Sequence, residues 1–128
     1  MQKYEVTVDT RGTKFWYQNG KLHRLNGPAV EHADGSKFWY QNGMLHRLDG
    51  PAAEILDPAG YKAWYQNGKH HRLDGPAVEY GNGDKEWYIN ETRYSEAEFL
   101  AKTQPVKVKE MTMQQISDEL GYQVKVVK

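Results

Sequence analysis

Short aromatic runs alternate with turn-forming residues along most of this chain. Residues 14–18 (Lys-Phe-Trp-Tyr-Gln) have the composition of a β-strand, and Asn19-Gly20 follows at once. Asn-Gly is a strong signal for a type I′ hairpin turn, because both central residues need a positive φ. We expect a return strand from Lys21, a bend at Gly27-Pro28, a short strand over residues 29–32 and a tight turn at Asp34-Gly35.

This hairpin pattern is repeated along the chain. The glycines that open each unit are Gly12, Gly35, Gly60 and Gly83, at intervals of 23, 25 and 23 residues. The fourth unit keeps its Trp, Tyr and Asn and then departs from the pattern, while residues 4–8 resemble the closing half of an earlier unit. The sequence therefore predicts a mainly β fold: an antiparallel β-hairpin repeat array over residues 1–94, elongated and single-layered, in which each unit stacks on its neighbours.

Each predicted strand carries large rings on both of its faces. Neighbouring side chains of a strand point to opposite faces, so the Trp and the Tyr that follow one another in each unit are expected to form two separate rows. One row holds Trp16, Trp39, Trp64 and Trp87, and the other holds Tyr17, Tyr40, Tyr65 and Tyr88. A single layer leaves at least one of these faces uncovered, so the rings are both the expected core and a candidate interface.

The last 34 residues follow a different pattern. Ser95 and Glu98 form a capping box that opens a helix, and Pro105 ends it. Residues 106–109 and 123–127 alternate like strands, on either side of a second short amphipathic helix. Residues 95–128 are therefore expected to form a small α/β cap, helix–strand–helix–strand, that covers the open edge of the array. Dimerisation or partner docking is the alternative role for this segment.

Composition narrows the function classes. The chain has 17 basic and 17 acidic residues, and the two signs balance within residues 1–11, 12–94 and 95–128. No segment therefore has the basic excess that drives sequence-independent nucleic-acid binding. Cysteine is absent, which excludes disulfides and thiolate chemistry and suits a reducing compartment. Mean hydropathy is −0.90, and no apolar run is long enough for a signal peptide or a membrane span, so a cytoplasmic protein is expected.

The repeat resembles a known family. Asn19-Gly20-Lys21-Leu22-His23 and Asp34-Gly35-Ser36-Lys37-Phe38 are similar to the unit of MORN-type repeats, over about residues 4–94. They look closer still to the MORN-like variants of bacterial antitoxin-type proteins and of small tailed-phage proteins. The chain has Arg24-Leu-Asn-Gly-Pro28 where a Gly-x-Gly pair is usual, so lipid-binding roles are not carried over. The resemblance implies a binding scaffold rather than a catalyst.

Two polar residues recur in the first three units. The histidines are His23, His46 and His71, and the arginines are Arg24, Arg47 and Arg72. Equivalent positions in successive units lie about 10 Å apart, too far to share a zinc ion, so the histidines are expected to be structural. The arginines are expected to pair with Glu31, Glu54 and Glu79 or to stack on a Trp ring. If the arginines instead stand free beside exposed rings, each unit offers a ring on which a base can stack and a guanidinium that can donate two hydrogen bonds to a phosphate.

These observations predict a non-enzymatic binding protein, because no motif for a nucleophile, a phosphate loop or a metal site is present. The predicted binding residues are the two ring rows named above, together with Arg24, Arg47 and Arg72. With the phage and antitoxin resemblance, the expected partner is a host or toxin protein that the chain inhibits. The first alternative is sequestration of a nucleotide-like immune signal, and the second is single-stranded nucleic acid, which the neutral charge disfavours. No cofactor, metal or membrane partner is expected. A homo-oligomer through the C-terminal element is the alternative to its capping role.

Overall fold

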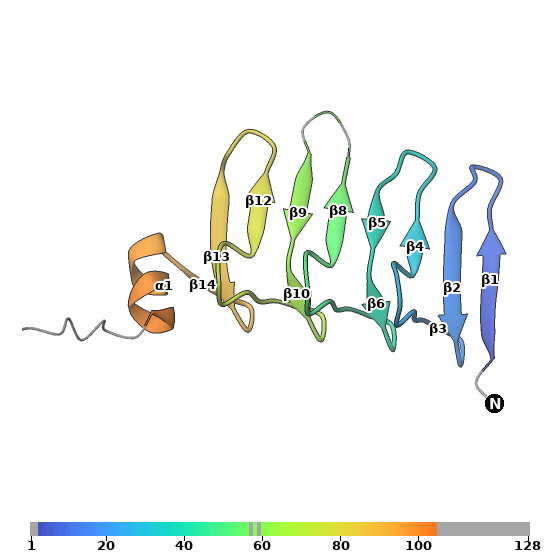
Figure 1. The fold of residues 1–128 in the computed structure, drawn as a ribbon, viewed down its shortest axis with the longest axis horizontal. Coiled ribbons are helices and arrows are strands. Elements are labelled where there is room, and N and C mark those ends of the chain that lie inside the picture. The colour runs from blue at the N-terminus through green and yellow to red at the C-terminus, as the bar shows by residue number, and fades with distance from the viewer. Residues whose placement is uncertain (1–2, 57, 59, 105–128) are drawn as a thin grey trace, which may run out of the picture.

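The computed structural model describes residues 3–56, 58 and 60–104, and it shows an elongated, single-layered antiparallel array (Figure 1). The chain moves steadily from one end of the array to the other, and no closed barrel forms. The strands are β1 (Tyr4–Val8), β2 (Lys14–Gln18), β3 (Lys21–Leu22), β4 (Val30–Glu31), β5 (Lys37–Phe38), β6 (Tyr40–Gln41), β7 (Met44–Leu45), β8 (Ala53–Ile55), β9 (Tyr61–Ala63), β10 (Tyr65–Gln66), β11 (Lys69–His70), β12 (Val78–Tyr80), β13 (Lys85–Ile89) and β14 (Thr92–Tyr94), and the helix is α1 (Glu96–Thr103). The predicted mainly β hairpin array is confirmed.

The hairpin turns have the predicted geometry. Asn19, Asn42 and Asn67 have φ of 54°, 52° and 51°, and the glycine after each is also positive, as a type I′ turn requires. The fourth unit forms its hairpin too, with Glu91 at φ 68° where the other units have glycine. The repeat therefore extends one hairpin further than the loss of the Asn-Gly signal indicated.

Each unit contributes to two tiers of hydrogen bonding. The first halves of the aromatic strands pair with β4, β8 and β12 in one long sheet that begins at β1. The second halves pair with β3, β7 and β11 as the Asn-Gly hairpins. Each hairpin is tied to the next, since Arg24 N–H donates to the Tyr40 carbonyl and Gly43 N–H to the Leu22 carbonyl. Successive units are thus joined in both tiers.

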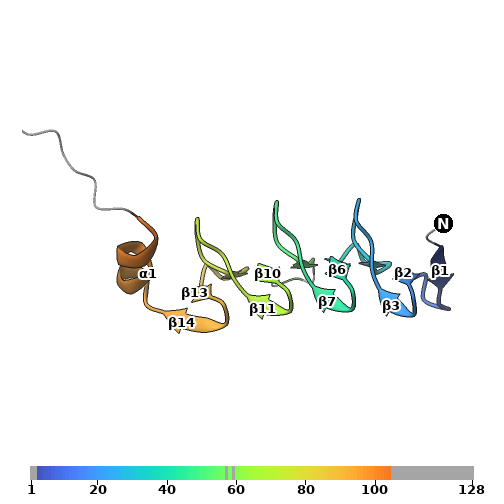
Figure 2. The ribbon, with the colours of Figure 1, turned by 90° about the horizontal axis from the view of Figure 1, so that it is seen from below.

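A five-residue loop separates the two tiers in each of the first three units. The predicted return strand from Lys21 to Arg24 is shorter than expected, because the chain leaves the sheet after Leu22. Residues 24–28, 47–51 and 72–76 form these loops, which project from one side of the array after β3, β7 and β11 (Figure 2). Each loop closes around a tryptophan: Trp16 N–H donates to the Ala29 carbonyl, and His23 N–H donates to the Trp16 carbonyl.

The two sides of the sheet differ in chemistry. We call the side that carries Trp16, Trp39, Trp64 and Trp87 the Trp face, and the side that carries Tyr17, Tyr40, Tyr65 and Tyr88 the Tyr face. Cross-strand register gives the Trp face an alternating ladder of charges: Lys14, Glu31, Lys37, Glu54, Lys62, Glu79 and Lys85. Opposite charges in adjacent strands stabilise this register.

The core is thin and consists of small residues. Ala29, Ala52 and Ala77 are fully buried where the loops rejoin the sheet. On the Tyr face, buried Ala53, Ala63 and Val78 lie beneath the rings of Phe38, Tyr61, Tyr65 and Tyr88. The large rings themselves are half-buried, which is how a single layer excludes water from its smaller residues.

Helix α1 lies at the C-terminal end of the array. Its capping box is formed as predicted, with the Ser95 hydroxyl accepting from Glu98 N–H and the Glu98 carboxylate accepting from Ser95 N–H. Phe99 is buried as α1 packs against β13 and β14. The helix follows β14 at the point where a five-residue loop follows the earlier hairpins. The rest of the predicted α/β cap, residues 105–128, lies outside the described residues.

Candidate docking face

An arginine covers a tryptophan in each of the first three units. The guanidinium carbons of Arg24, Arg47 and Arg72 lie 4.0, 3.8 and 3.9 Å from the ring centres of Trp16, Trp39 and Trp64. Such stacking joins a cation–π attraction to the packing of two flat groups. The repetition of this geometry within 0.2 Å shows that it belongs to the architecture of the unit.

The same arginines are held by the loop that carries them. Arg47 Nη1 donates to the Pro51 carbonyl at 3.0 Å and to a Glu54 oxygen at 3.5 Å, while its Nε donates to Asp49 at 3.0 Å. Arg72 makes the matching contacts, and the hydrogen bond from Arg72 lowers the pKa of Asp74. The predicted Arg–Glu pair and the predicted stacking on Trp therefore occur together, and the guanidinium groups do not stand free as phosphate forks.

A glycine makes room for each guanidinium. A Cβ on Gly27, Gly50 or Gly75 would lie 2.9, 2.9 or 2.8 Å from the arginine Cζ of the same loop, closer than such atoms approach. The glycine of the Gly-Pro pair is thus needed for a close approach as well as for a bend.

The repeated histidines join neighbouring units. Nδ1 of His23, His46 and His71 accepts a hydrogen bond of 3.0 Å from the backbone N–H of Asn42, Asn67 and Asn90, respectively. Each ring therefore satisfies the first residue of the next hairpin turn. This is a structural role, as expected, and it links one hairpin to the turn of the next.

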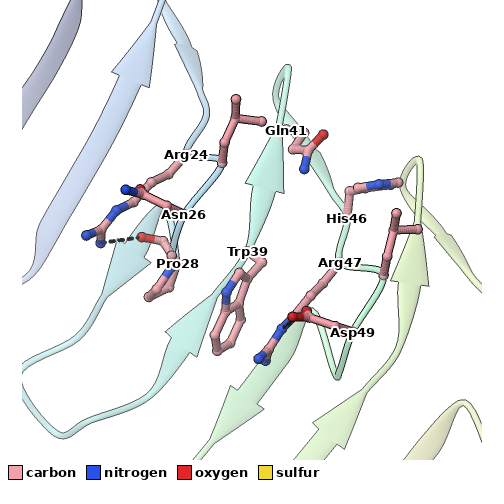
Figure 3. Close-up of a pocket in the computed structure, with 11 residues that line it drawn as sticks. Arg24, Asn26, Pro28, Trp39, Gln41, His46, Arg47 and Asp49 are labelled. Carbon is pink, nitrogen blue, oxygen red and sulfur yellow. Dashed lines mark hydrogen bonds and ion pairs between the residues drawn. The ribbon is translucent and has the colours of Figure 1, made fainter.

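The loops enclose two open grooves on the Trp face. The first has a volume of about 470 Å³ and the second about 460 Å³. In the first, Trp39 lies between Pro28 of one loop and Arg47 of the next, with Gln41 and His46 nearby (Figure 3). Trp64, Gln66 and His71 take the same places in the second groove. The array thus presents one recess twice, one repeat apart.

A leucine that sequence analysis did not select lies at each loop. Leu25, Leu48 and Leu73 are 65%, 76% and 56% exposed, and all three line the grooves. The sequence shows that a leucine follows the arginine in each of the first three units. Whether that leucine is exposed, however, depends on the loop leaving the sheet. On the same face, Tyr4, Val6 and Val8 of β1 are also exposed and lie opposite Gln18, Trp16 and Lys14.

The Tyr face has fewer exposed apolar groups. Tyr17 and Tyr40 lie opposite Leu22 and Leu45, and all four side chains are half-buried against one another. Tyr80 is the large apolar side chain of this face that is exposed among the described residues. Of the predicted binding residues, the tyrosines therefore lie on the smoother, more self-covered side, and the tryptophans lie on the grooved side.

The third and fourth units depart from the repeat at two positions that contact each other. His70 stands where the earlier hairpins have the strand residues Leu22 and Leu45, and Glu91 stands where they have the turn glycine. His70 Nδ1 lies 2.9 Å from a Glu91 oxygen. The His70 ring lies between Tyr65 and Tyr88, with ring centres 4.3 and 4.8 Å away. The side-chain hydrogen bond with His70 is the main cause that lowers the pKa of Glu91.

The fourth tryptophan lacks the arginine lid of the others. Trp87 is followed at the equivalent positions by Tyr94 and Ser95, and the loop is replaced by the start of α1. Lys102 lies over the Tyr94 ring at 5.3 Å. Trp87 is therefore a predicted binding residue in a different setting from Trp16, Trp39 and Trp64.

Comparison of the chain with family models, with curated proteins and with solved structures gives no match in any of the three. No helix in the described part of the chain is long and apolar enough to cross a membrane. The same residues contain no group of three His or acidic side chains that is placed to hold a metal ion.

Proposed function

We propose that this chain is a non-enzymatic repeat scaffold that binds a partner protein on its Trp face. The main support is a ridge of three exposed leucines, one in each of the first three units, beside two equivalent grooves. These leucines are Leu25, Leu48 and Leu73. Monomeric proteins seldom leave a regular apolar row in water unless it contacts something. Burying one such side chain fully contributes about 1.5–3 kcal/mol, so the three leucines together would supply a substantial part of the binding energy of a specific contact.

The surroundings of the leucines suit a protein partner. Trp39 and Trp64 line the two grooves, and Asp49 and Asp74 stand exposed beside two of the leucines. Aromatic and leucine anchors within a polar rim are the usual composition of a protein–protein contact. A nucleotide sink gains less support, because the guanidinium groups that would grip a phosphate already bind their own loops.

The MORN-like resemblance extends this proposal to the kind of partner. Its antitoxin-type and phage examples favour a host or toxin protein whose activity the chain blocks by occupying a surface. The repeat then acts as a rigid template, since its arginines, histidines and glycines build the units and leave the loop leucines to recognise the partner.

The test is capture of a partner by immobilised full-length chain from bacterial lysate, with matched variants. Leu25→Asp/Leu48→Asp should lower retention of a stoichiometric partner at least tenfold, because two anchors become charged. Leu56→Asp is the control: Leu56 is 62% exposed but lies away from the ridge, and its retention should equal that of the unmodified chain. Equal capture by both variants, or no captured protein at all, would overturn the proposal.

A further inference from the structure

The two ends of the array are finished differently. At the C-terminal end, α1 packs on β13 and β14. At the other end, β1 pairs with β2 along its whole length and has no second strand beside it among the described residues. Every residue of β1 is exposed, with Tyr4, Val6 and Val8 at 42%, 52% and 60%. Such an edge invites a further strand.

The backbone groups of β1 that point outward can be assigned. Asp9 N–H donates to the Thr13 carbonyl, so the N–H of Asp9 points toward the strand that leads into β2. In an antiparallel ladder hydrogen-bonded and non-bonded pairs alternate, so Thr7 and Glu5 bond to β2. The N–H and carbonyl groups of Tyr4, Val6 and Val8 therefore point away from β2. The hydrogen bond of Trp16, which faces Val6, supports this assignment. The Trp16 N–H donates to the Ala29 carbonyl, on the side of β2 away from β1.

We propose that the partner of this edge is a second copy of the chain, paired β1 to β1 in antiparallel register about Val6. Val6 then exchanges two hydrogen bonds with Val6 of the partner subunit, and Tyr4 does so with Val8 of the partner subunit. Since the arrangement is two-fold symmetric, Val8 also pairs with the partner's Tyr4. All outward-pointing groups of β1 are satisfied, as in other strand additions.

The side chains suit this register on both faces. On the Trp face, the exposed Tyr4, Val6 and Val8 meet the same three apolar residues of the second copy. On the Tyr face, Glu5 meets Thr7 of the partner subunit, and Lys3 meets Asp9 of the partner subunit. No like charges stand opposite each other, and one pair at each end is oppositely charged, which favours this register over its neighbours.

The symmetry has a consequence for the Trp face. Directly opposed residues in an antiparallel pair lie on the same side of a sheet, so both Trp faces of the dimer point the same way. The loop leucines of the two copies then form one surface of twice the length. The dimer forms through β1 whether or not the loops bind a partner.

Cysteine cross-linking tests the register, because the natural chain has no cysteine. Hydrogen-bonded antiparallel residues have Cα atoms about 5.5 Å apart, within the reach of a disulfide. Val6→Cys should therefore oxidise to a covalent dimer nearly completely. Val8→Cys is the matched control: its two copies would lie roughly 15 Å apart, so it should stay monomeric on a non-reducing gel.

Sedimentation of the unmodified chain completes the test. We expect a concentration-dependent dimer, and Val6→Pro should abolish it without unfolding the array, since the Val6 N–H does not bond to β2. A monomer at all concentrations, equal cross-linking of the two cysteine variants, or a dimer that persists in Val6→Pro would each overturn the proposal.

Discussion

At the scale of single residues, the unit is built around one stacked pair. Arg47 lies on Trp39, and Gly50 lets the loop close over the guanidinium. The pair is half-buried and each partner depends on the other: the ring gives the cation a surface, while Pro51, Glu54 and Asp49 accept its hydrogen bonds. Such dependence makes the energies of neighbouring residues non-additive.

Gly50→Ala should lower the free energy of unfolding by about 1–3 kcal/mol, because the new Cβ displaces the Arg47 guanidinium. Urea unfolding followed by tryptophan fluorescence measures this. In an Arg47→Ala background the same glycine substitution should cost much less, since the displaced group is gone. Equal costs in the two backgrounds would contradict the close approach of Gly50 and Arg47.

At the scale of elements, contacts between units hold one hairpin on the next. His46 joins the second hairpin to the turn of the third, as His23 and His71 do for their neighbours. The last hairpin has an additional link, the His70–Glu91 pair, where the repeat would place a leucine and a glycine. Glu91 holds a positive φ there, and its contact with His70 offsets the strain of a non-glycine residue.

The Glu91 link should make stability depend on pH. The pKa of Glu91 is lowered in the folded state, mainly by its hydrogen bond with His70. The unfolded state therefore binds the proton first, and the stabilisation is present above the ordinary glutamate pKa of 4.5 and is lost as pH falls through the lower folded value. The chain should be more stable than Glu91→Gln at pH about 5, with a difference that shrinks towards pH about 3.

Urea midpoints across this pH range provide the measurement for Glu91. His70→Leu is the control, because it restores the residue of the earlier repeats and removes the partner. In that background Glu91→Gln should change the pH profile less, because only the hydrogen bond from the backbone N–H of residue 70 to the Glu91 carboxylate remains. A difference between the chain and Glu91→Gln that stays constant with pH would show that the ionised Glu91 carboxylate does not hold the last hairpin.

At the scale of the whole molecule, the structure is a chain of neighbour contacts. Each unit touches its neighbours in the array, and the described part of residues 3–104 shows buried residues clustered between neighbouring strands rather than one core that runs through all units. Repeat proteins of this kind have stabilities that are sums of unit and interface contributions. The array should therefore tolerate the loss or gain of a whole unit.

Deletion of residues 16–38, which joins Phe15 to Trp39, should give a shorter folded array, because one complete unit is removed in register. Its denaturant dependence of unfolding should fall by about a fifth, in proportion to the surface lost. Circular dichroism and urea unfolding measure both. Deletion of residues 16–30 removes only part of a unit and serves as the control: it should lower the free energy of unfolding more than the first deletion does, because the first strand no longer continues into a complete hairpin. Loss of cooperative unfolding in the first deletion would mean that the units are not interchangeable.

The sequence alone determined the repeat unit, because turn geometry is a local property. Asn-Gly needs no distant contact to specify a type I′ turn, and Ser95 with Glu98 specifies its own helix start. Because successive side chains of a strand point to opposite faces, the sequence also placed the tryptophans on one face of the sheet and the tyrosines on the other. The roles of Arg24 and His23 were foreseen in kind, since a residue present in several units serves the unit.

Only the tertiary structure decided which residues face water. Leu25, Leu48 and Leu73 are exposed because the chain leaves the sheet after β3, β7 and β11, where the loop closes over the stacked Trp and Arg. Likewise, the contact between His70 and Glu91 joins residues 21 positions apart in sequence. The local sequence determines turns and strands. The solvent exposure of a side chain depends on all the residues that surround it in space, and many of these belong to other units.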